Sequence, residues 1–335
     1  MKKQNKNHKV SNKKDFNTVC YDNGIWVTAS ENDNGLYYSE DGKIWTQSNI
    51  TDVSFYIVYH NGSVWVAGSN NNGLYYSEDG KIWTQSNITN NSFYTVYYDN
   101  GIWVAGCYKY LYYSEDGKNW TQSNITSGIF NTVYYGNGIW VAGGIIYSKG
   151  LYYSEDGKNW IQSNITSGDF NTVYYNNGIW VAGSNNNGLY YSEDGKTWTQ
   201  SNIISDDFCT VYYDNGIWIA GGESDNGLYY SEDGKTWAPS NITKDNYYTV
   251  YYGNGIWVAG CYKGLYYSED GKNWTQSNVT SSPFFTVYYD NGIWIVSGRY
   301  DNNNGIYYSI DGKIWIQSNI TKDNYYTVYH SKNKK

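Results

Sequence analysis

The side chains of this chain that could take part in catalysis are mostly carboxylates, and they form two groups. The pair Glu40–Asp41 returns in repeat after repeat, whereas four loop acids have no such repetition, at Asp206, Asp207, Glu223 and Asp225. Glycoside hydrolysis requires two carboxylates about 5–10 Å apart, one of them with a raised pKa. A pair copied many times is typical of scaffold, because an active site breaks the symmetry of a repeat protein. We therefore interpret Glu40–Asp41 as structural and predict that the chain is not an enzyme, although the unrepeated acids leave a hydrolase open.

Histidine and cysteine show no spacing that is typical of a metal site. The histidines are His8, His60 and His330, and the cysteines are Cys20, Cys107, Cys209 and Cys261. The Asp-Asn run at 301–304 lacks the distal Glu of an EF-hand calcium loop. Cys107 and Cys261 hold the same place in the third and seventh repeats, on opposite sides of a ring of eight, so they are expected to lie beyond the ~7 Å Cα separation that a disulfide allows. The sequence thus predicts no catalytic residue, no metal, no cofactor, and free thiols that suit a reducing compartment.

These residues are positioned by a repeat whose most regular part is Ser39–Trp45, with the sequence SEDGKIW. It or a close variant occurs eight times, 37 to 41 residues apart, with its Trp at 45, 83, 120, 160, 198, 237, 274 and 315. Strand-like runs at 16–21, 25–29, 35–39 and 44–48 are separated by Asn23-Gly24, a loop and Asp41-Gly42, and Asn-Gly is a strong hairpin signal. Four antiparallel strands in ~38 residues form one propeller blade. The sequence therefore predicts an all-β propeller of eight four-stranded blades over 16–330.

Tryptophan occupies two fixed positions in every repeat. The second-strand tryptophans are at 26, 65, 103, 140, 180, 218, 257 and 294, and with the eight above they account for all sixteen. We predict that they form the core or the contacts between blades.

The first-strand motif occurs nine times, because a further copy lies at 325–329. Many propellers close their ring with a strand from the opposite terminus. We predict such a terminal-strand closure, in which 325–329 competes with or replaces 16–21 in the first blade. Deletion of residues 1–21 would then leave the thermal stability nearly unchanged.

The formal charge of −8 is unevenly distributed along the chain. Residues 1–15 and 331–335 contain nine Lys and one Asp, which leaves a charge of −16 over 16–330. We interpret both ends as short disordered basic tails. The acidic body argues against binding nucleic acid, which requires clustered cations. No stretch resembles a membrane span or a secretory signal peptide, so we expect a cytoplasmic or virion-associated protein without membrane insertion.

The turn motif resembles the Asp-box, also called the bacterial neuraminidase repeat, which reads Ser/Thr-x-Asp-x-Gly-x-x-Trp and is one residue longer. The resemblance covers 16–330 and implies a propeller with the motif on the hairpin between the third and fourth strands. It implies a structural role for Ser39, Asp41, Gly42 and Trp45, and for Asp79, Asp116, Asp156, Asp194, Asp233, Asp270 and Asp311. The repeats are rich in Asn, Lys and Tyr, and in this composition they resemble proteins of bacteria or their phages. Sialidases of this repeat type need three arginines to bind the substrate carboxylate. Arg299 is the single arginine here, so the chain cannot form that triad and we do not expect a sialidase.

The repeats differ mainly in the connections between the second and third and between the fourth and first strands. These are predicted to share one face of the disc, and their Tyr, Asn, Ser and Gly content is typical of adaptable binding loops. We predict multivalent binding of a glycan or surface polymer there. The predicted ligand-binding residues are Tyr108, Tyr110, Tyr147, Lys149, Lys263, Arg299 and Tyr300. The alternative is a protein–protein scaffold, such as part of a phage tail or surface assembly; the oligomeric state stays open.

Overall fold

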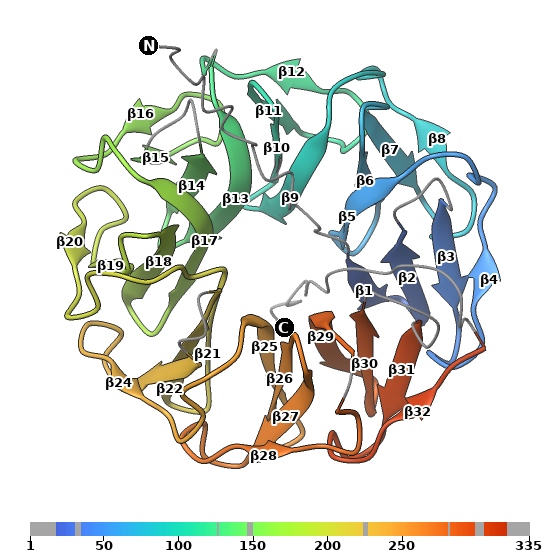
Figure 1. The fold of residues 1–335 in the computed structure, drawn as a ribbon. Helices are drawn as coiled ribbons and strands as arrows, with labels where there is room; N and C mark the ends of the chain where they lie inside the picture. Colours follow the sequence, from blue (N-terminus) through green and yellow to red (C-terminus); the bar gives the residue numbers. More distant parts are fainter. Residues whose placement is uncertain are drawn as a thin grey trace, which may run out of the picture.

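The computed structural model describes residues 18–30, 35–125, 127–145, 150–223, 227–280, 282–298 and 305–319. These residues form eight four-stranded antiparallel sheets arranged as blades around a central opening (Figure 1). Within each blade the strands pair in chain order, from the innermost strand to the outermost. The predicted eight-bladed propeller is confirmed.

The strands fall into four equivalent sets. The innermost strands are β1 (Val19–Asp22), β5 (Phe55–His60), β9 (Phe93–Asp99), β13 (Ile129–Gly136), β17 (Asp169–Asn176), β21 (Thr210–Asp214), β25 (Tyr247–Gly253) and β29 (Phe284–Asp290). The second strands are β2 (Ile25–Ala29), β6 (Trp65–Ser69), β10 (Ile102–Cys107), β14 (Ile139–Ile145), β18 (Ile179–Asn185), β22 (Ile217–Gly221), β26 (Ile256–Cys261) and β30 (Ile293–Gly298). The third strands are β3 (Leu36–Ser39), β7 (Leu74–Ser77), β11 (Leu111–Ser114), β15 (Gly150–Ser154), β19 (Leu189–Ser192), β23 (Leu228–Ser231), β27 (Gly264–Ser268) and β31 (Ile306–Ser309). The outermost strands are β4 (Thr46–Gln47), β8 (Thr84–Gln85), β12 (Thr121–Gln122), β16 (Ile161–Gln162), β20 (Thr199–Gln200), β24 (Ala238–Pro239), β28 (Thr275–Gln276) and β32 (Ile316–Gln317).

The first hairpin of the blade forms because Asn-Gly accepts a left-handed backbone. Asn23 and Gly24 have φ of 49° and 80°, and the Asn-Gly pairs of six other blades have nearly the same values. In blade 2 the positions of Asn23 and Gly24 are taken by Gly62 and Ser63. There the Asn61 carboxamide oxygen accepts hydrogen bonds from the backbone N–H groups of Ser63 and Val64, at 3.0 and 2.8 Å. The outermost strand predicted at 44–48 is shorter than expected, because Ile44 lies in the preceding bend and the strand extends only over Thr46–Gln47.

The second hairpin is fixed by the repeated turn motif. In blade 1, Ser39 Oγ donates to Asp41 and accepts from the Gly42 N–H, while Asp41 Oδ1 accepts from the N–H groups of Lys43 and Ile44. Gly42 has φ of 71°, and the seven equivalent glycines lie between 71° and 73°. The equivalent aspartates accept the same backbone hydrogen bond in the other seven blades: Asp79, Asp116, Asp156, Asp194, Asp233, Asp270 and Asp311.

The core lies within and between the blades, as predicted for the tryptophans. The second-strand tryptophans are at most 1% exposed, and the tryptophans that end the turn motif are at most 4% exposed. Seven inner-strand tyrosines also stack on one another around the opening, with ring centroids 4.8–5.2 Å apart: Tyr59, Tyr97, Tyr134, Tyr174, Tyr212, Tyr251 and Tyr288. In blade 1 this position is Cys20, which is fully buried.

The predicted terminal-strand closure involves 16–21 and 325–329, and because 325–329 lies outside the described residues, its part in the closure stays a prediction. The inner position of blade 1 is filled by β1 from the N-terminal side, paired with β2 from Val19–Thr28 to Asp22–Ile25. At the junction of blades 8 and 1, Asn319 of blade 8 accepts from the backbone N–H of Trp45 at 3.0 Å and donates to its carbonyl at 3.3 Å.

The same amide clasp joins every pair of neighbouring blades. The Asn two residues beyond each outermost strand bonds both backbone groups of the Trp in the next blade, at 2.7–3.3 Å; these residues are Asn49, Asn87, Asn124, Asn164, Asn202, Asn241, Asn278 and Asn319. Seven clasps span about one repeat and the eighth joins Asn319 to Trp45 at the two ends of the ring, so none could be recognised from local sequence alone.

Candidate functional site

The antiparallel strand order gives the disc two different faces. The Asn-Gly hairpins and the motif hairpins lie at one end of the strands, and we call this the constant face. The connections between second and third strands and between successive blades lie at the other end, the variable face. Because the constant face repeats with little change, a recognition site that differs from blade to blade belongs on the variable face.

Two opposite blades present the same short loop on the variable face. The loop is Cys107-Tyr108-Lys109 in blade 3 and Cys261-Tyr262-Lys263 in blade 7. Both cysteines are fully buried, whereas the side chains of Tyr108 and Tyr262 are 44% and 58% exposed. Both lysines are exposed as well. Each loop therefore projects an aromatic ring and an adjacent cation from a buried anchor.

The backbone of these loops is held by the connection that leads from the preceding blade. The Tyr108 N–H donates to the Ser92 carbonyl at 3.2 Å, and the Tyr262 N–H donates to the Asn246 carbonyl at 3.0 Å. Cys107 N–H also donates to the Tyr110 carbonyl at 3.0 Å. Both tyrosines are thus presented from a hydrogen-bonded turn, which lowers the entropy lost on binding.

The loop of blade 7 carries an additional buried charge. The Asp245 carboxylate lies 3.9 Å from Lys263 Nζ and accepts from the Cys261 thiol at 3.5 Å. Burial and the adjacent Asp245 raise the pKa of the Cys261 thiol to about 12. The equivalent residue in blade 3 is the neutral Asn91, so the two loops share their aromatic group but differ in electrostatics.

Three of the seven predicted binding residues can be placed. Tyr108 and Lys263 are exposed on the variable face. Tyr110 is partly buried and makes an edge contact with Tyr112, at 6.1 Å and 88°, so it supports the loop. The other four, Tyr147, Lys149, Arg299 and Tyr300, lie outside the described residues.

Several residues of this face were missed from the sequence. Tyr262 and Lys109 could have been found, because each is the exact counterpart of a residue that was predicted. Two ring pairs at the variable-face ends of the inner strands were also missed: Tyr56–Tyr94, with centroids 5.5 Å apart, and Tyr248–Phe285, at 4.5 Å. Asn131 and Asn171 hold the same position in blades 4 and 5. At this position of the inner strand, blades 2, 3, 7 and 8 therefore carry paired rings, whereas blades 4 and 5 carry amides.

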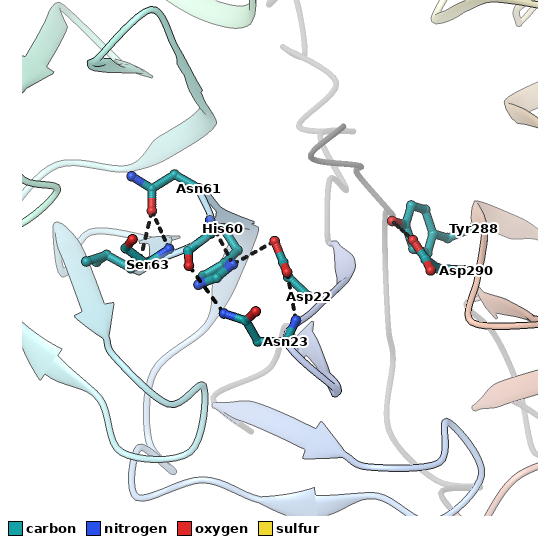
Figure 2. Close-up of polar contacts among 9 residues, drawn as sticks. Asp22, Asn23, His60, Asn61, Ser63, Tyr288 and Asp290 are labelled. Atoms are coloured by element: carbon teal, nitrogen blue, oxygen red, sulfur yellow. Dashed lines mark hydrogen bonds and ion pairs between the residues drawn. The ribbon is translucent and has the colours of Figure 1, made fainter. Parts of the chain in front are cut away.

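A polar cluster at the constant-face end of the inner strands was also not predicted from the sequence, because its contacts join residues of different blades. Figure 2 shows His60 of β5 beside Asp22 of β1, with His60 Nδ1 2.9 Å from Asp22 Oδ2. Asn23 Nδ2 donates to the Gly62 carbonyl at 3.3 Å. The His60 ring is 1% exposed and stacks on Trp65 at 4.3 Å. This cluster therefore joins blade 1 to blade 2, and its histidine is enclosed.

On the other side of β1 from His60, in β29, the Tyr288 hydroxyl donates to Asp290 Oδ2 at 3.2 Å (Figure 2). Burial raises the pKa of Asp290, and nearby Asp22 adds to that shift, although the Asn291 N–H and Tyr288 oppose it. In the part of the chain that the structure describes, no group of three or more His, Cys, Asp or Glu residues could hold a metal ion. The described residues also include no helix that could cross a membrane.

Comparison with known proteins identifies the architecture. No protein-family model and no curated protein matches the chain. Solved structures do match. A computationally designed protein, Ika8, superposes with a TM-score of 0.69 at 9% identity, over 84% of this chain and 92% of its own. YCF48 bound to D1 peptide gives 0.53 at 16% identity, over 74% and 89%. An ancestral GH74 enzyme gives 0.50 at 13% identity, over 89% and 61%. The chain is thus an eight-bladed propeller similar to YCF48 and GH74 propellers, and at these identities the similarity concerns the fold alone.

Proposed function

We propose that this propeller is a non-enzymatic recognition module that binds a glycan or surface polymer through its variable face. The observation that carries the proposal is the pair of exposed tyrosines, Tyr108 and Tyr262, each beside a lysine on the same loop of two opposite blades. A Tyr ring packs on the C–H face of a sugar, while hydroxyl and amide groups bond its edge. Asn70, Asn71 and Asn72 in blade 2 supply such amides on the same face.

Multivalency follows from the repetition. Two equivalent weak sites on one rigid disc gain avidity when the ligand itself repeats, as a polysaccharide does. The binding residues that we propose are Tyr108, Tyr262, Lys109 and Lys263, together with the predicted residues that lie outside the described ranges.

We also propose that the motif hairpins are shortened Asp-boxes of the bacterial or phage type. Their Ser, Asp, Gly and Trp occupy the hairpin between third and fourth strands, and the Trp45 indole N–H donates to the Gly42 carbonyl at 3.1 Å. This assignment concerns the scaffold and carries no activity with it.

A glycan array tests the proposed function directly. The labelled wild-type protein and a Tyr108→Ala/Tyr262→Ala variant are applied to the same array, with Ile161→Thr on the rim of blade 4 as a matched control. The proposal expects selective binding that the double variant loses and the control keeps. A blank array with a folded wild-type sample would reject the sugar ligand and favour the protein-scaffold alternative.

The scaffold alternative is supported by a specific observation on the opposite face, where exposed isoleucines gather at the junction of blades 8, 1 and 2. A hydrolase remains a third class; it would show turnover that disappears when one loop carboxylate, such as Asp207, is neutralised.

A further inference from the structure

The rim of the constant face carries a ladder of ion pairs between neighbouring blades. The motif Lys of one blade lies 2.6–3.0 Å from the motif Glu of the preceding blade at seven junctions: Lys81–Glu40, Lys118–Glu78, Lys158–Glu115, Lys196–Glu155, Lys235–Glu193, Lys272–Glu232 and Lys313–Glu269. Each of these lysines also lies over a tyrosine ring of the preceding blade, at 5.1–5.6 Å. At these seven junctions the motif lysine and the motif glutamate are paired.

The ladder is interrupted at the eighth junction, between blades 8 and 1. Ile310 replaces the glutamate there, and its side chain is 71% exposed. Lys43 Nζ still lies over the ring of Tyr308 in blade 8, 5.6 Å from the ring centroid. Within the described residues, however, Lys43 has no carboxylate at ion-pair distance. Lys43 is therefore held in the same place as its counterparts but lacks the anion that each of them binds.

Exposed isoleucines flank this gap on both sides. The residue after the motif Lys is Ile314 in blade 8, Ile44 in blade 1 and Ile82 in blade 2, with side chains 63%, 65% and 61% exposed. In blades 3 to 7 the same position holds a polar residue: Asn119, Asn159, Thr197, Thr236 and Asn273. Single exposed apolar residues are common on protein surfaces. Here, three consecutive blades, 8, 1 and 2, all carry isoleucine at this position. Ile310, which replaces the motif glutamate, lies at the junction between blades 8 and 1.

We propose that Ile310, Ile314, Ile44 and Ile82, with Lys43 among them, form a docking surface, which we call the seam arc, for a protein segment that presents apolar side chains beside a carboxylate. The partner's carboxylate takes the position on Lys43 that glutamate takes at the other junctions. Its apolar side chains cover the isoleucines, whose burial supplies the hydrophobic part of the affinity. Because the arc follows the rim over three blades, an extended segment fits it.

The charges of the surface exclude other ligand classes. A single unpaired cation on a body of charge −16 does not attract nucleic acid or an anionic membrane. Isoleucine offers no aromatic face or hydrogen-bonding group to a sugar, so the seam arc is distinct from the glycan site proposed on the variable face.

The chain itself supplies matched variants. Ile310→Glu restores the repeat sequence and the eighth ion pair, and Ile44→Asn copies blades 3, 4 and 7. Both side chains are exposed, so neither change removes core packing, and both proteins are expected to fold with an unchanged or slightly higher Tm. Ile161→Thr, at a 57% exposed isoleucine of blade 4, removes an apolar side chain outside the arc.

A random peptide library displayed on phage, panned against the full-length protein, tests the proposal. Synthetic copies of the enriched peptides are then titrated by fluorescence anisotropy against each variant. The proposal expects an enriched pattern of apolar residues next to Asp or Glu, and Kd at least tenfold weaker for Ile310→Glu and Ile44→Asn. Ile161→Thr and Tyr108→Ala should bind as wild type.

Any of four results would overturn the proposal. The first is the absence of any enriched peptide, and the second is equal Kd for wild type and Ile310→Glu. The third is a self-association in sedimentation that Ile310→Glu abolishes, which would make a second copy of this chain the occupant in place of an acidic-apolar segment. The fourth is a loss of binding in Tyr108→Ala alone, which would instead assign the peptides to the variable face.

Discussion

Gly195, in the motif hairpin of blade 5, occupies a position where any side chain meets two obstacles. Its φ is 71°, and an added Cβ would lie 3.0 Å from Trp180 Nε1 and 3.1 Å from Ile139 Cγ2 of the preceding blade. Gly178 in the same blade has φ of 79° and nothing within 4 Å, so it isolates the backbone cost. We expect Gly178→Ala to cost about 1–2 kcal/mol and Gly195→Ala about 1–3 kcal/mol more, because overpacking is added. Urea unfolding measures both, and equal losses would contradict the contact between blades.

The motif aspartates predict the acid sensitivity of the fold. Burial disfavours the Asp116 carboxylate, but hydrogen bonds from the Asn119 N–H and side chain, the Lys118 N–H and Ser114 outweigh it and lower the pKa to about 2. A depressed folded pKa gives stability that is present above the unfolded value and lost as the pH falls through the folded one. The free energy of unfolding should therefore decrease from pH 4 towards pH 2.

The matched variant for this prediction is Asp116→Asn, which keeps an acceptor oxygen but does not titrate. Its unfolding free energy should change less steeply with pH over the same interval than that of the wild type. Parallel pH profiles for the two proteins would show that the carboxylate does not contribute as we describe.

At the scale of the elements, the blades are joined by hydrogen bonds that repeat with the period of the chain. Asn164 bonds the backbone of Trp198 at 2.9 and 2.8 Å, and Asn319 bonds Trp45 at 3.3 and 3.0 Å. Removing either Asn should cost about 1–3 kcal/mol for two hydrogen bonds. Blades 4 and 5 are consecutive in the chain, whereas blades 8 and 1 are not. Because the Trp45 N–H donates to Asn319, Asn319→Ala should also speed hydrogen exchange at this amide, whereas Asn164→Ala should leave it protected.

The N-terminal strand gives a second prediction at this scale. Because β1 fills the inner position of blade 1 and buries Val19 completely, deletion of residues 1–22 should destabilise the ring. Loss of the Val19 side chain alone is worth about 1.5–3 kcal/mol. A thermal melt followed by circular dichroism measures the change, and an unaltered Tm would contradict this expectation and favour the predicted replacement of this strand by 325–329.

The sequence predicted those elements that depend on local chemistry. Asn23-Gly24 and Asp41-Gly42 located both hairpins, and Trp26 and Trp45 located the core, because turn geometry and burial are encoded within a few residues. The clasp by Asn49 and the pair Asp22–His60 join residues of different blades, so a periodic pattern gave no sign of their contacts. Ile310 was visible as a departure from the repeat, but its meaning depended on the ion pairs that the other seven junctions make.

At the scale of the whole molecule, the constant face and the clasps build a disc whose symmetry is broken in a few places. Loops that carry Tyr108 and Tyr262 break it on the variable face, and the seam arc breaks it on the rim. Fold similarity to a designed protein, a peptide-bound factor and an enzyme shows that the disc itself does not determine what is bound. Function in this protein is therefore expected at these departures from the repeat.

The most direct test of this account is a titration of the polysaccharide selected on the array against wild type, Tyr108→Ala, Tyr262→Ala and the double variant. We predict that each single variant binds the polymer at least tenfold more weakly, since avidity is lost, and that the double variant shows no binding. All variants should keep the wild-type Tm, because both side chains are exposed. If the double variant binds the polymer as tightly as wild type, recognition does not occur through these loops and the central claim fails.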